Sequence, residues 1–179
     1  MNYDKLRIVM NSFIISQFGY CPLVWMFHSR GLNNRINKIH ERTLRLVYKD
    51  DKSTFEELLL KDNSFTIHDR NLQILATEMY KSINNISPAI TKSIFQVKNT
   101  PYNLRSGVNL CTKNVKTVKY GTETLSFRGP KLWAKVPDKI KNSNSLFEFK
   151  SKIKKWKPIG CECKLCCTYI HNLGYVTLQ

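Results

Sequence analysis

The strongest constraint on the fold is a helical period in residues 32–49, where apolar and basic side chains each recur at spacings of three and four. At about 100° per residue the two sets lie on adjoining faces of one helix. We therefore predict a helix over 32–48 with one face packed inward and five cations in a line beside it. The inward set is Leu32, Ile36, Ile39, Thr43 and Leu46, and the basic set is Arg35, Lys38, Arg42, Arg45 and Lys49.

Capping signals predict three further helices, each from a Ser or Thr with a carboxylate three residues later. The S-T-F-E run at 53–56 opens a short helix to Leu60, and the weaker T-I-H-D run at 66–69 opens a long helix to about Asn84. The S-L-F-E run at 145–148 opens a helix whose apolar stripe is Leu146, Phe149, Ile153 and Trp156.

Residues 8–27 carry no charged side chain. We expect a first helix that begins near Leu6 and is ended by Gly19 and Pro22, and because it is apolar on nearly every side it should be buried. Because this chain offers little apolar surface to cover that helix, we also expect that its natural packing partner lies upstream in a longer protein. Polar residues and the proline interrupt the apolar run, which argues against a membrane-spanning helix.

The region after Phe95 has a different character. Turn-forming residues dominate 99–107, and we predict short strands at Val115, Val118, Tyr120 and 122–127, then short helical turns around Trp133. The expected fold is mainly α. A helical, bundle-like part (1–95) precedes a small irregular α+β segment ending in a lysine-rich helix (96–157), and a Cys-rich tail follows (158–179).

The net charge of +16 is concentrated in one segment: residues 98–157 hold 15 basic and 3 acidic side chains. Such an excess suits a phosphate backbone, although a solvated lysine-rich surface remains an alternative. The predicted nucleic-acid-binding residues are the five cations of 32–49 and the lysines of the last helix, whose role would be phosphate neutralisation. Those lysines are Lys150, Lys152, Lys154, Lys155 and Lys157.

The run Tyr48-Lys49-Asp50-Asp51 has the Y-x-D-D form of a reverse transcriptase active site. That chemistry needs a hairpin between apolar strands and a third carboxylate to hold divalent metal. Here the run follows an amphipathic helix and precedes a capping signal. We therefore predict an exposed turn between helices, no catalytic residues and no polymerase activity in this chain.

Four of the six cysteines lie within 161–167. With no convincing secretory signal before them, we expect an intracellular, reducing location, in the nucleus or cytoplasm. Cys161, Cys163, Cys166 and His171 are the candidate ligands of a zinc ion, with Cys167 as an alternative fourth ligand and metal-free thiols as the alternative state. The isolated histidines are expected at the surface or in caps: His28, His40 and His68.

Several segments, read in order, resemble the region after the polymerase domain in non-LTR retrotransposon reverse transcriptases of the jockey and chicken-repeat type. They cover nearly the whole chain and are FGYCPLVWMFHSRGLNNRINKIHERTLRLVYKDDKSTFEELLLKDNSFTIHDRNLQ, SPAI, YNLR, TVKYGTETLSFRGPKLWAKVPDKIKN, SLFEFKSKIKKWKP and CECKLCCTYIHNLGYV.

The resemblance implies that this chain is a thumb-like helical region followed by a tail. In the full-length parent, an upstream polymerase palm domain would be its partner, and that domain would hold the catalytic magnesium. It also implies binding of RNA and target DNA. We therefore expect a nucleic-acid-binding, catalytically incomplete fragment of an RNA-directed DNA polymerase. The alternative is a membrane-associated or partner-binding structural protein with residues 8–27 as its anchor.

Overall fold

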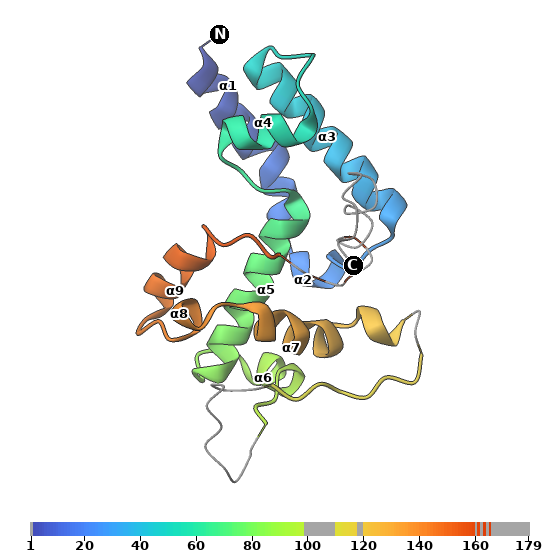
Figure 1. Cartoon of the computed structure of the whole chain (residues 1–179), viewed down its shortest axis with the longest axis vertical. Coiled ribbons are helices and arrows are strands. Elements are labelled where there is room, and N and C mark those ends of the chain that lie inside the picture. The colour runs from blue at the N-terminus through green and yellow to red at the C-terminus, as the bar shows by residue number, and fades with distance from the viewer. Residues whose placement is uncertain are drawn as a thin grey trace, which may run out of the picture. The chain divides into compact units, whose positions relative to one another are not determined.

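The structure is a computed structural model that describes residues 2–98, 110–117, 120–159, 161, 163 and 165, and these residues are mainly helical, as predicted (Figure 1). Shorter helical turns occur at Met10–Ile14 (π), Ile15–Gly19 (3-10) and Gly121–Glu123 (3-10). The α-helices are α1 Tyr3–Val9, α2 Pro22–Trp25, α3 Arg30–Tyr48, α4 Phe55–Asp62, α5 Ile67–Ile83, α6 Ala89–Ile94, α7 Leu125–Lys135, α8 Asp138–Lys141 and α9 Leu146–Ile153.

The chain forms two compact units, residues 1–71 (unit 1) and 72–179 (unit 2), and the division falls inside α5. Each unit has buried apolar side chains of its own. The three-part division at residues 95 and 157 stays a prediction.

The core of unit 1 is built from α1, α3, α4 and the π-helical turn, which lie together in Figure 1. Leu6 and Phe55 pack at its edge. Its buried members are Met10, Leu44, Val47, Leu58 and Leu59.

The inward face of α3 differs from the prediction. Leu46 is 71% exposed, and Leu32 and Ile39 are also exposed. Ile36 and Thr43 of the predicted set are buried, and the other buried side chains of α3 are Asn33, His40, Leu44 and Val47. The observed buried set also lies on one helix face, and it adds the polar side chains of Asn33 and His40. The packing of α1 and α4 against Leu44 and Val47 selects it.

The helix starts follow the capping signals, with one shift. The box that opens α4 is Thr54 with Glu57, one residue later than predicted, because Ser53 donates its hydroxyl to Asp50 instead. At α5, the Thr66 hydroxyl accepts the backbone N–H of Asp69 at 3.1 Å. At α9, the Ser145 hydroxyl accepts the N–H of Glu148 at 3.1 Å.

The first helical segment is not buried on all sides, contrary to the expectation. Phe13 is 72% exposed and Ile8 is also exposed, whereas Met10 enters the core. α1 covers the core with one side only, through Leu6. Among the described residues, no helix is both long and apolar enough to cross a bilayer.

The predicted α+β segment is wrong where the structure describes it. Residues 121–123 form a 3-10 turn, and α7 begins at Leu125 and continues through Gly129 and Pro130. Gly129 allows this helix to pack closely, since a Cβ atom there would lie 2.6 Å from Cε1 of Phe95. The β pairing in the described residues is limited to one bridge, between Val97 and Leu110.

An aromatic stack holds α5, α7 and α9 together in unit 2. The ring of Phe149 stacks on Tyr80, with centroids 4.2 Å apart, and on Trp133 at 6.2 Å. The Tyr80 hydroxyl donates to the carbonyl of Ser143 at 2.7 Å, and Gln73 Nε2 donates to the carbonyl of Trp156 at 2.8 Å. Trp133 therefore lies in the core of unit 2.

Candidate functional site

Four of the five predicted cations of α3 and its C-cap, Lys49, are available to a ligand. Arg35, Lys38, Arg42 and Lys49 are exposed, and none has an ion-pair partner among the described residues. Arg45 differs, because its Nη2 lies 2.7 Å from Oε1 of Glu41 and its Nη1 donates to the carbonyl of Asp50 at 3.3 Å. Arg45 therefore fixes the end of α3, and the other four form an unpaired cationic face.

α9 ends at Ile153, before Trp156 of the predicted apolar stripe, so only Lys150 and Lys152 of the predicted lysines lie on it. The predicted lysines on and after α9 divide in the same way as the cations of α3. Lys152 lies 2.6 Å from Oε1 of Glu148 and donates to the carbonyl of Lys139 at 3.2 Å, so its charge is neutralised locally. The hydrogen bond from Lys152 lowers the pKa of Glu148. The exposed lysines without an ion pair among the described residues are Lys150, Lys154, Lys155 and Lys157.

Sequence reasoning did not single out Phe147, which lies on α9 three residues before Lys150. Its side chain is 85% exposed, whereas Phe149, two residues later, is fully buried. The signal was present in the helical period, because residue 147 falls off the stripe that Phe149 and Ile153 define. An exposed aromatic ring therefore accompanies the positive charge of α9.

The Tyr48–Asp51 run forms the turn between α3 and α4, as predicted. Asp50 accepts hydrogen bonds from the hydroxyl of Ser53 at 2.8 Å, from the N–H groups of Ser53 and Lys52, and from Lys61 at 3.2 Å. The Ser53 hydroxyl, with these other donors, holds the pKa of Asp50 well below its usual range. The Asp50 carboxylate is thus occupied in shaping the turn.

Tyr48 contributes to a charged cluster around the buried Asp62 in unit 1. Its hydroxyl donates to Oδ1 of Asp62 at 3.0 Å, and Arg7 Nε lies 2.9 Å from the same oxygen. Burial and hydrogen bonds to Tyr3 and Asp62 raise the pKa of Tyr48 above its usual range. The cluster ties the start of α1 to the ends of α3 and α4.

His40 is fully buried beside this cluster, which contradicts its predicted surface position. Its ring meets Phe55 edge-on, with centroids 5.5 Å apart, and neither ring nitrogen has a hydrogen-bond partner among the described residues. Burial, reinforced by the positive charge of Arg70, lowers the pKa of His40 to about 4. His40 is therefore a neutral core residue near neutral pH.

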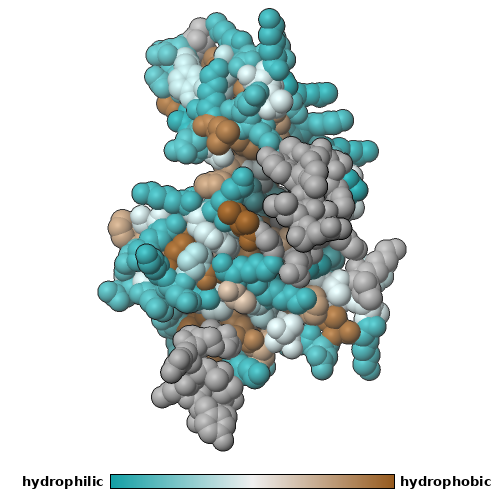
Figure 2. Space-filling view, viewed as in Figure 1, coloured by the Kyte–Doolittle hydropathy of each residue, from teal (hydrophilic) through white to brown (hydrophobic). Residues whose placement is uncertain are grey.

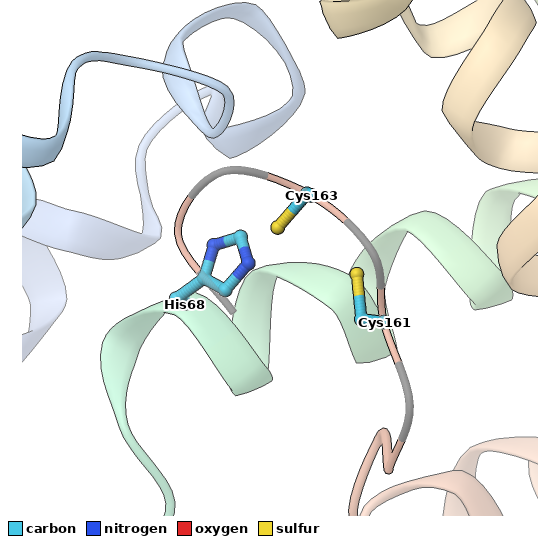
Figure 3. Close-up of side chains that lie close together, drawn as sticks. All are labelled: His68, Cys161 and Cys163. Atoms are coloured by element: carbon cyan, nitrogen blue, oxygen red, sulfur yellow. The ribbon is translucent and has the colours of Figure 1, made fainter. Parts of the chain in front are cut away.

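His68 is also buried, which contradicts its predicted surface or cap role. It lies on the first turn of α5, and one ring nitrogen and the two thiol sulfurs of Cys161 and Cys163 all lie within 4.8 Å of one another (Figure 3). Two thiolates and an imidazole are donors that a transition metal accepts. This group could hold a metal ion.

The structure thus brings two of the four predicted metal ligands together and adds one from far away in the sequence. The other two, Cys166 and His171, lie outside the described residues, as does Cys167. Nothing in the local sequence around His68 marks it as a ligand, because its approach to Cys161 depends on the tertiary fold.

On the face shown in Figure 2, hydrophilic side chains predominate and apolar ones form separate patches. Neither a protein-family model, nor a curated protein, nor a solved structure matches this chain. The functional assignment therefore rests on the chemistry of its residues and on the resemblance noted above.

Proposed function

We propose that this chain binds nucleic acid through its phosphate backbone, as the catalytically incomplete, post-polymerase part of a non-LTR retrotransposon reverse transcriptase. The unpaired cations on α3 carry the proposal. Arg35, Lys38 and Arg42 lie along one side of the 19-residue helix α3, and Lys49 is its C-cap residue. None of the four has an acidic partner in the described part of the chain. A linear polyanion matches such a row, since each cation can contact one phosphate group.

The lysines of α9 add a second region of the same chemistry. Unpaired cations repel one another. When such cations contact the phosphates of a nucleic acid, the counterions condensed on it are released, and this release favours binding. Among the described residues, the carboxylates near these cations do not belong to a group of three or more possible metal ligands. Binding without base selection is the function this chemistry favours.

The first test is the salt dependence of binding. Replacing Arg35, Arg42 and Lys49 with alanine should flatten the plot of log K against log salt for duplex DNA by about 2–3, because each lost phosphate contact removes about 0.9 from the slope. Fluorescence anisotropy of a labelled duplex at several salt concentrations measures the slope. Circular dichroism checks that the variant keeps its helices.

Arg45→Ala is the matched control, because it removes a cation of the same helix that is already paired with Glu41. Its slope should remain that of the unmodified protein. The proposal is wrong if the protein does not bind duplex DNA at low salt, or if the triple variant keeps the original slope.

We further propose that His68, Cys161 and Cys163 bind Zn²⁺. Zinc takes this mixture of imidazole and thiolate, with bonds of about 2.0–2.3 Å and tetrahedral geometry. Cys166, Cys167, His171 or a water molecule would supply the fourth position. Bound zinc would order the segment after α9, since its binding energy becomes local folding energy.

Metal content, measured by mass spectrometry on reduced protein, tests the zinc proposal. We expect about one zinc ion per chain, and we expect it to be lost in Cys163→Ser and in His68→Gln, because each removes a ligand. Cys21→Ser, which changes an exposed cysteine elsewhere, should keep the metal. Zinc that is lost in His171→Gln but retained in His68→Gln would instead assign the site to the tail alone.

A further inference from the structure

α9 presents two aromatic side chains on opposite sides. At about 100° per residue, Phe149 lies about 200° from Phe147 around the helix axis. Phe149 is buried in the stack with Tyr80 and Trp133, and Phe147 is 85% exposed. The exposed ring of Phe147 is therefore not part of the core of unit 2. Because little of its apolar surface is removed from water on folding, it contributes little to the stability of the fold.

Two unpaired lysines share the outward side of α9 with Phe147. Lys150 follows one turn later and Lys154 two turns later, both within about 60° of Phe147 around the axis. Lys154 keeps right-handed helical backbone angles at the end of α9, so this geometry extends to it. Both lysines are exposed, and Ser151 between them is small and exposed.

The one carboxylate of α9 does not neutralise this side. Glu148 accepts from Lys152 at 2.6 Å and from the backbone N–H of Asn144 at 2.9 Å, so both of its oxygens are engaged. The side of α9 that carries Phe147 thus combines a flat aromatic face with two positive charges. An apolar protein surface would have to desolvate both lysines in order to cover the ring.

We propose that Phe147, Lys150 and Lys154 form a stacking platform for single-stranded nucleic acid. The ring of Phe147 stacks on an unpaired base, and the two lysines contact the phosphates beside it. Base–aromatic stacking tolerates any sequence, because every base has a π face, and it needs bases that are not already stacked in a duplex. This inference rests on the proposed function and names the form of nucleic acid that α9 selects.

The test compares three labelled probes of equal length by fluorescence anisotropy at low salt: oligothymidine, a DNA duplex, and an abasic strand that keeps the phosphates but lacks bases. Phe147→Ala in the full chain should weaken oligothymidine binding by about fivefold or more. Its binding to the duplex and to the abasic strand should be unchanged. Phe147→Trp should bind oligothymidine at least as well as the unmodified protein, because it keeps an aromatic face.

The outcomes separate this inference from the proposed function. If Phe147→Ala binds oligothymidine like the unmodified protein, or weakens all three probes equally, the stacking platform is overturned while phosphate binding stands. If the unmodified protein binds none of the probes, both proposals fail. If Phe147→Ala binds all three nucleic-acid probes like the unmodified protein but loses binding to vesicles of phosphatidylcholine and phosphatidylserine, this side of α9 binds lipid and the inference is overturned.

Discussion

Phe149→Ala should destabilise unit 2 by about 3–5 kcal/mol, which is the usual cost of removing a buried phenylalanine ring. The side chain is fully buried and stacks on Tyr80 and Trp133, so its loss leaves a cavity among three helices that cannot close without moving them. Because a domain is stable by only about 5–15 kcal/mol, much of the folded population of unit 2 should be lost on mild heating.

The free energy of unfolding of α7 and α9 is measured by hydrogen exchange of their peptides at increasing urea concentrations. Phe147→Ala is the matched control: it removes the same side chain from the same helix at an exposed position, and it should change stability by less than about 0.5 kcal/mol. Equal destabilisation by the two substitutions would contradict the assignment of Phe149 to the core and Phe147 to the surface.

Acidification should destabilise unit 1 through His40. Its pKa is about 4 in the folded chain and 6.5 in the unfolded chain. Near neutral pH both states hold it neutral, so it has no effect. As the pH falls below 6.5 the unfolded state takes up the proton first, and stability is lost progressively down to the folded pKa. From about pH 7 to about pH 5 the loss should be about 2 kcal/mol.

His40→Leu should remove this pH dependence, because it fills the same buried space with a group that cannot ionise. The carboxylates with lowered pKa, Asp50 and Glu148, contribute stability that is lost only in more acidic solution, below their ordinary values of 3.8 and 4.5. The window above pH 5 therefore isolates the histidine. Hydrogen exchange of α3 peptides in urea measures the effect, and an unchanged pH slope in His40→Leu would show that His40 does not cause it.

Local sequence patterns predicted α3, α4, α5 and α9. The period of 32–48 identified α3, the capping residues located α5 and α9, and α4 began only one residue late. These features depend on interactions within one helical turn, such as a hydroxyl that accepts an N–H three residues later. The excess of basic residues is likewise a property of the sequence, and so is the turn at Tyr48–Asp51.

Tertiary packing decided which face of each helix is used and which distant residues meet. On α3 two overlapping stripes were compatible with the helical period, and packing against α1 and α4 buried Leu44 and Val47 and left Leu46 exposed. The segment 122–127 became helical, although its composition suggested strands, with Leu132 and Trp133 of the same helix buried. The approach of His68 to Cys161 depends on contacts between residues more than ninety positions apart, which no local pattern encodes.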